Sequence, residues 1–110
     1  ADYKGFLFGG RAVNFEAKYT DTERMNQDRV TPDQADRLER AHQFGALAFV
    51  LCSFGSVGFY RIPWEVWRDM KARYGHKYMT PQEAAPFEVR IGGPGVLLFL
   101  EGINIKEETP

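Results

Sequence analysis

Apolar and polar side chains alternate strictly along a nine-residue stretch near the N-terminus. Val13, Phe15 and Ala17 occupy one set of alternate positions, and Glu16 and Lys18 occupy the other. Because successive strand residues point to opposite faces of a sheet, this pattern predicts a strand with Val13, Phe15 and Ala17 toward a core. Glu16 and Lys18 then lie side by side on the opposite face. They are either a surface ion pair or a metal-binding carboxylate beside a cation that orients a water molecule.

A short strand and a tight turn precede this stretch. The segment 5–8 is mostly apolar, and Gly9-Gly10 between two strand patterns is typical of a hairpin turn. Antiparallel pairing across that turn predicts that Asp2 lies near Glu16 and Lys18.

Two capping signatures mark the starts of helices. Residues 31–34 (Thr-Pro-Asp-Gln) and 80–83 (Thr-Pro-Gln-Glu) place Thr at the N-cap, Pro at the first helical position and Gln or Glu three residues after the cap. Gly45 ends the first helix. Gln34 shares the inward face of that helix with Leu38, so its side chain either completes the capping box or looks toward the sheet.

A continuous apolar run over residues 46–52 predicts a strand that is buried on both faces and central in the sheet. Cys52 within it is expected to be a small core residue. Residues 20–30 lack periodicity and are expected to form a loop. A helix over residues 63–74 carries an aromatic stripe, which forms either core packing or a platform for base stacking.

The C-terminal part carries weaker signals. Residues 87–91 and 96–100 predict a last hairpin around the Gly-Gly-Pro-Gly turn at 92–95. We expect a single domain over residues 1–103 and a frayed tail over residues 104–110.

Composition limits the class of protein. The chain has 110 residues, of which 44% are hydrophobic and 15% aromatic, and these values favour a packed globule over disorder. A formal net charge of -1 means that any DNA-binding surface must be local. The most basic local cluster is either such a surface or a solvated helix face, and comprises Arg68, Lys71, Arg73, His76 and Lys77.

A single cysteine excludes an internal disulfide and fits a reducing compartment. No apolar run is long enough to span a membrane, and no secretion signal opens the chain. The sequence therefore predicts a cytoplasmic protein without a membrane partner.

The order of the polar motifs resembles that of the PD-(D/E)xK nuclease superfamily: an aspartate ahead of a hairpin, Glu-x-Lys on its second strand and a glutamine at the start of the next helix. The chain is more narrowly similar to the RecU-type Holliday junction resolvases. That similarity extends from Asp2 to about Ile62 and is carried by Asp2-Tyr3-x-Gly5, Gly10-Arg11, Phe15-Glu16-Ala17-Lys18-x-Thr20 and Gln34.

The resemblance implies a fold and a chemistry. The fold would be α/β, with a mixed β-sheet flanked by helices and a restriction-endonuclease-like core lacking the N-terminal helix. Asp2 and Glu16 would ligate Mg2+ or Mn2+ through carboxylate oxygens, with the Ala17 carbonyl as a further oxygen ligand. Lys18 would orient the attacking water and offset charge in the transition state, and Gln34 would position the water or the phosphate.

The resemblance also implies a branched DNA substrate and a homodimer, since a four-way junction has two symmetric strands to cut. DNA contacts are expected from Thr20, Arg68, Lys71, Arg73 and Lys77. Two departures from the family pattern are Asp33, where the resolvases carry His, and the expected absence of the N-terminal helix with its acidic residue and of the protruding stalk. Two other hypotheses therefore remain beside a junction resolvase: a restriction-type or repair-type duplex nuclease of the same fold, and a non-catalytic interaction domain.

Overall fold

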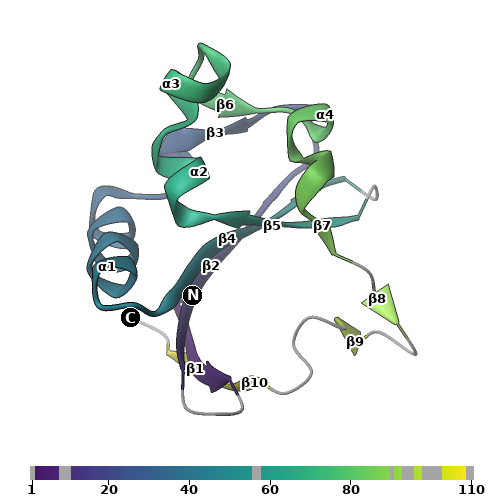
Figure 1. Cartoon of the computed structure of the whole chain (residues 1–110). Helices are drawn as coiled ribbons and strands as arrows, with labels where there is room; N and C mark the ends of the chain where they lie inside the picture. The colour runs from purple at the N-terminus through teal and green to yellow at the C-terminus, as the bar shows by residue number, and fades with distance from the viewer. Residues whose placement is uncertain are drawn as a thin grey trace.

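A six-stranded mixed sheet forms the centre of the molecule (Figure 1). The computed structural model describes the backbone of residues 2–7, 11–55, 58–89, 91–92, 96–97 and 103–108. In spatial order the strands are β10 (Ile103–Glu108), β1 (Asp2–Leu7), β2 (Ala12–Thr20), β4 (Leu47–Phe54), β5 (Phe59–Pro63) and β7 (Glu88–Val89). The fold is α/β, with helices packed on a mixed sheet, which is consistent with a restriction-endonuclease-like core.

β1 and β2 pair antiparallel, as the hairpin pattern predicted. Their register places Asp2 directly opposite Glu16 and Phe6 opposite Ala12. The predicted Gly9-Gly10 turn between the strands lies outside the described residues. The expected proximity of Asp2 to Glu16 is therefore confirmed at the level of the backbone.

β2 and β4 pair in parallel, and the helix α1 (Pro32–Gln43) makes the crossover between them. The predicted capping box at its start is present, with both the Thr31 and the Gln34 hydrogen bonds formed. The helix ends at Gln43 with Phe44 as its C-cap, and Gly45 follows with φ of +85°. Such positive φ values are readily adopted only by glycine, so the predicted stop signal acts as expected.

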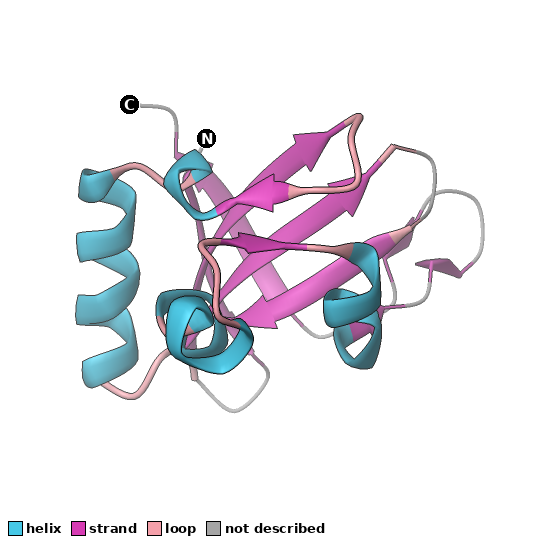
Figure 2. Ribbon diagram, turned by 90° about the horizontal axis from the view of Figure 1, so that it is seen from above, coloured by secondary structure: helices cyan, strands magenta, loops and turns pink. Residues whose placement is uncertain are grey.

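The buried side chains form one cluster on each face of the sheet. The larger cluster lies under the helices and contains every buried helical side chain that the structure describes, namely Leu38, Trp64, Val66, Trp67, Met70 and Ala84. The smaller cluster, on the opposite face, comprises Val13, Phe15, Phe49 and Leu51. Viewed from above, the long helix α1 stands at the left beside the strands (Figure 2).

The prediction for the two faces of β2 was only partly right. Val13 and Phe15 are buried as expected, but Ala17 is exposed and Glu16 is only 1% exposed. The reason is the position of β2 inside the sheet, between β1 and β4, with α1 packed over the face that carries Glu16. Alternation alone identified the two faces of the strand, but it did not show that the face carrying Glu16 is covered.

The apolar run at residues 46–52 is a central strand, as predicted, since β4 lies between β2 and β5. Cys52 is fully buried in it. The helix expected over residues 63–74 is two short helices, α2 (Trp64–Arg68) and α3 (Met70–Tyr74), separated by Asp69. Its aromatic stripe is core packing, because the tryptophan side chains are buried beneath these helices.

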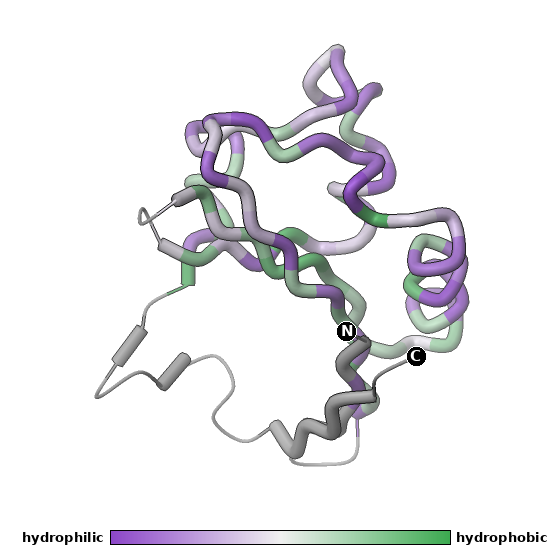
Figure 3. Tube along the Cα trace, turned by 180° about the vertical axis from the view of Figure 1, so that it is seen from behind, coloured by the Kyte–Doolittle hydropathy of each residue, from purple (hydrophilic) through white to green (hydrophobic). Residues whose placement is uncertain are grey.

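The segment expected to be a loop at residues 20–30 contains two short elements, β3 (Met25–Asn26) and the 3-10 helix η1 (Gln27–Arg29). β3 pairs antiparallel with β6 (Tyr78–Met79), and Met25 is fully buried. Figure 3 shows mostly hydrophilic residues along the trace at the top of the molecule, where β3 and β6 lie. A two-residue strand is too short to produce a periodic pattern of apolar residues, so the sequence did not predict it.

The second capping signature forms α4 (Pro81–Ala84), followed by the 3-10 helix η2 (Ala85–Phe87). The last predicted hairpin is divided between two sheets: β7 extends the main sheet, while β8 (Ile91–Gly92) pairs with β9 (Val96–Leu97). Its turn residues 93–95 lie outside the described residues.

Residues 104–108, predicted as part of a frayed tail, lie in β10 and pair with β1. Isoleucines alternate with polar residues at 103–106, which is the strand signal that the prediction overlooked. Among the described helices, none has the length and apolarity required to cross a bilayer.

Candidate active site

Two acidic residues are register partners where β1 and β2 run side by side. Asp2 is the register partner of Glu16, and residues directly opposite each other in an antiparallel pair share a face of the sheet. Glu16 is 1% exposed and lies beside Val50 of β4 on its other side. A buried carboxylate is retained in a fold only where hydrogen bonds, an opposite charge or a metal ion compensate its lost hydration. The burial of Glu16 therefore indicates that its carboxylate has a compensating partner or a functional role.

Alternate backbone carbonyls of β2 point to the edge of the strand that faces β1. The Thr20 carbonyl accepts the Gly55 N–H at 2.7 Å on the β4 side, and the Tyr19 carbonyl accepts from Arg29 Nη2 at 2.8 Å. Because successive carbonyls of a strand point to opposite edges, the Ala17 carbonyl shares the edge of the Tyr19 carbonyl, away from β4. Both lie beyond the last described β1–β2 pair, Asp2 and Glu16, so the Ala17 oxygen is at the β1 edge, one residue past that pair.

Lys18 brings a positive charge to the same strand. It lies on the face of β2 that carries Glu16, two residues along, beside Cys52 of β4 in the register. Its side chain is half-buried and makes no hydrogen bond or ion pair with any residue that the structure describes. An ammonium group in this position is available to a water molecule or an anion.

Gln34 lies at the first turn of α1, the helix that packs against β2 and β4. Its Oε1 accepts the Thr31 N–H at 3.0 Å, and its own N–H donates to Thr31 Oγ1 at 3.2 Å. The capping alternative is therefore confirmed. The side-chain amide nitrogen retains its two N–H donors, so a second role toward the site stays a prediction.

The five residues predicted to contact DNA come from β2, α2, α3 and the segment between α3 and β6. Thr20 is buried, and its Oγ1 lies 3.0 Å from the Thr22 hydroxyl. Arg68 bonds to Asp69 and Glu39, which raise its pKa, and Lys71 Nζ donates to the Gly75 carbonyl at 3.2 Å. The remaining two, Arg73 and Lys77, are exposed. The DNA contacts of all five residues remain predictions.

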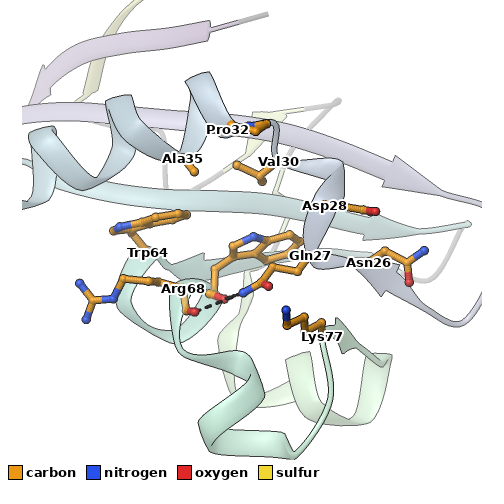
Figure 4. Close-up of a pocket in the computed structure, with 10 residues that line it drawn as sticks. Asn26, Gln27, Asp28, Val30, Pro32, Ala35, Trp64, Arg68 and Lys77 are labelled. Atoms are coloured by element: carbon orange, nitrogen blue, oxygen red, sulfur yellow. Dashed lines mark hydrogen bonds between the residues drawn. The ribbon is translucent and has the colours of Figure 1, made fainter.

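A pocket beside α1 is a separate feature. A pocket of about 610 Å3 lies between η1, the start of α1 and α2 (Figure 4). Figure 4 shows Val30, Pro32 and Ala35 across from Arg68 and Lys77, and Gln27 Nε2 donates to the Trp67 and Arg68 carbonyls at 3.0 and 3.2 Å. None of the predicted catalytic residues lines this pocket, although two predicted DNA-binding residues do.

The residues at the β1–β2 edge carry the type of ligand atom that a hard divalent cation prefers. Two carboxylate residues in register and a backbone carbonyl on the same edge are the oxygen ligands that Mg2+ and Mn2+ prefer. Among the described residues there is no cluster of three His, Cys, Asp or Glu side chains. A protein-held cation here would therefore rely on Asp2, Glu16 and the Ala17 carbonyl, with water or phosphate completing the shell.

The structure brings one further charged residue to this edge that the sequence did not single out. Arg29 follows β3 and reaches the Tyr19 carbonyl of β2. It lies in the segment that was expected to be a loop, where neither periodicity nor a motif distinguishes it from its polar neighbours.

Comparison with protein-family models matches residues 1–105 to RecU, Recombination protein U. A search of curated proteins found no match. Because the family model covers nearly the whole chain, the chain belongs to the RecU family, a family of Holliday junction resolvases. Membership supports an enzymatic role as a nuclease in recombination.

Proposed function

We propose that this RecU-family chain is a metal-dependent endonuclease that nicks branched DNA, with four-way junctions as its preferred substrate. The observation that carries the proposal is the register of β1 and β2, which sets Asp2 opposite the buried Glu16 at the edge shared by the Ala17 carbonyl. Family membership supports the substrate class.

Each residue of the site has a distinct task in this proposal. Asp2, Glu16 and the Ala17 carbonyl hold Mg2+ or Mn2+ through oxygen atoms. When bound, the divalent cation lowers the pKa of a water molecule and screens the negative charge of the phosphate.

Lys18 supplies a fixed positive charge next to that site. Phosphodiesters repel anionic nucleophiles, and further negative charge builds up on the phosphoryl oxygens in the transition state. An ammonium group held on a strand lowers that barrier without having to reorganise during the reaction. Lys18 is therefore assigned to orient the attacking water and to stabilise the phosphoryl oxygens.

Gln34 has a double assignment. Its carbonyl oxygen fixes the first turn of α1 through the capping box, and its amide N–H groups position the water or a phosphate oxygen. The same residue then couples the start of the helix to the site on the sheet.

A homodimer completes the proposal. A four-way junction presents two strands related by two-fold symmetry, and paired nicks require two active sites facing them. We assign Arg73 and Lys77, which are exposed, to contacts with the DNA backbone, together with Arg68, Lys71 and Thr20.

Cleavage of labelled DNA tests the proposal. The chain is incubated with Mn2+ and an end-labelled four-way junction, or with linear duplex of the same arm sequence. The proposal predicts symmetric nicks in the junction that require the metal and disappear in Glu16→Gln and Lys18→Ala. Glu23→Gln is the matched control, because Glu23 is an exposed carboxylate in the turn after β2.

The outcomes separate the alternatives. Equal cutting of junction and duplex would keep the site and favour a duplex nuclease. Full activity of Glu16→Gln, or the absence of cleavage by the wild-type chain on either DNA, would contradict the proposal. The second result would favour a non-catalytic interaction domain.

A further inference from the structure

Arg29 lies at the edge of β2 that carries the proposed metal ligands. Its Nη2 donates to the Tyr19 carbonyl at 2.8 Å. The Tyr19 and Ala17 carbonyls share this edge of the strand and are separated by two residues, or roughly 6.6 Å along the strand. The guanidinium group is therefore held next to the position where a cation between Asp2, Glu16 and the Ala17 carbonyl would meet a phosphate.

The charge of Arg29 also reaches the face of the sheet on which Lys18 lies. Burial raises the pKa of the Cys52 thiol to about 12, and the nearby Arg29 charge acts in the opposite direction. Cys52 is the register neighbour of Lys18 on β4. Arg29 and Lys18 thus bring positive charge to the same face of the sheet, each beside Cys52.

Arg29 retains the capacity to bind an anion. The side chain is exposed, and a guanidinium group has five N–H donors in a planar fork that matches two phosphate oxygens. Among the described residues its one hydrogen bond is to Tyr19. The remaining donors are open to a ligand, while the Tyr19 bond limits the number of conformations that the side chain samples.

We infer that Arg29 is a phosphate-binding residue of this active site, which takes a non-bridging oxygen of the scissile phosphodiester beside Lys18. The inference rests on the proposed nuclease function and extends it by one residue. Arg29 binds the phosphate both before and during attack, and its charge is most useful when negative charge on the phosphoryl oxygens is largest.

The alternative role for Arg29 is structural, as a clamp between β2 and the segment that leads into α1. Kinetics and the salt dependence of binding distinguish the two roles. Arg29→Ala, Arg29→Lys and the control Arg40→Ala are compared with the wild-type chain on the four-way junction. Arg40 is a matched control because it is an exposed arginine that pairs with Asp36 on the outer side of α1.

A phosphate-binding role predicts that Arg29→Ala lowers kcat roughly 100-fold with Mn2+, as does the loss of a single transition-state donor in other enzymes. With Ca2+ in place of Mn2+, the slope of log Kd against log salt should fall by about one unit. Arg29→Lys should be intermediate, because it keeps the charge but loses the fork. Arg40→Ala should retain the wild-type kcat and slope.

Thermal unfolding of each variant accompanies these measurements, and Arg29→Lys remains informative if Arg29→Ala fails to fold. If the wild-type chain cuts the junction and the Arg29 variants keep its kcat and salt slope, the inference is wrong and the proposed function stands. If the wild-type chain neither binds nor cuts the junction, the proposed function fails and the inference falls with it.

Discussion

Glu39 connects α1 to α2, and its charge should contribute measurably to folding. Its Oε1 accepts from Trp64 Nε1 at 2.8 Å and from Arg68 Nη1 at 3.0 Å, and its Oε2 accepts from Gln43 Nε2 at 2.6 Å. These hydrogen bonds, that of Trp64 first, lower the pKa of Glu39 from 4.5 to about 2. Glu39→Gln keeps the shape of the side chain and removes the charge.

The magnitude follows from the pKa change. A shift from 4.5 to about 2, at about 1.4 kcal/mol per pKa unit, gives an upper bound of about 3.5 kcal/mol. The side chain of Glu39 is 29% exposed, so screening by water reduces this contribution to about 1–2 kcal/mol. Because the folded-state pKa lies below the unfolded-state value, the contribution is complete above about pH 5 and is lost as the pH falls toward 2.

Urea unfolding at a series of pH values checks this expectation. The free energy of unfolding of Glu39→Gln should lie about 1–2 kcal/mol below that of the wild-type chain at neutral pH. The difference should shrink as the pH falls below about 4.5, down to the lowest pH at which both proteins are folded. Asp36→Asn, which removes an exposed ion pair from the same helix, should change the free energy by less than about 1 kcal/mol. A difference between Glu39→Gln and wild type that is independent of pH would refute the role of the charge.

Three further expectations test the core and the capping box. Cys52 is fully buried and burial raises its pKa to about 12, so a thiol reagent should react with it only after unfolding; rapid labelling of the native chain would contradict this. Met25→Ala should lower the free energy of unfolding by about 2–5 kcal/mol in urea titrations, because the Met25 side chain is fully buried in the core. A loss below about 1 kcal/mol would contradict its core role. Gln34→Ala should cost about 1 kcal/mol through loss of the capping bond, and Gln34→Glu should restore it. If Gln34→Glu restores both stability and cleavage, Gln34 needs no amide N–H at the site; restored stability without cleavage supports the second role.

Local sequence signals were sufficient to predict the helix starts, the central strand and the hairpin around β2. The two Thr-Pro signatures predicted helix starts because the capping bonds are local, and both boxes are formed. The apolar run ending at Cys52 predicted a central strand because such a strand is covered on both faces. The hairpin signal likewise placed Asp2 near Glu16, since antiparallel register follows from the turn.

Features that depend on contacts between distant segments were missed. The burial of Glu16 was not predicted, because a single strand cannot reveal that α1 packs over it. Met25 was assigned to a loop because its strand partner is Met79, more than fifty positions further along the chain. Arg29 was overlooked for the same reason: its contact with the Tyr19 carbonyl exists only once the chain has folded back on β2.

The central claim is that Asp2 and Glu16 form one site for a divalent cation, and the thermal stability of the chain with and without Mn2+ tests it directly. At a Mn2+ concentration about 100 times the dissociation constant, binding should stabilise the wild-type chain by about 2.7 kcal/mol and raise its Tm by roughly 10 °C. The shift should be lost in Asp2→Asn and in Glu16→Gln, and retained in the exposed control Glu23→Gln. An unchanged shift in Glu16→Gln, or no shift in the wild-type chain, would contradict the claim.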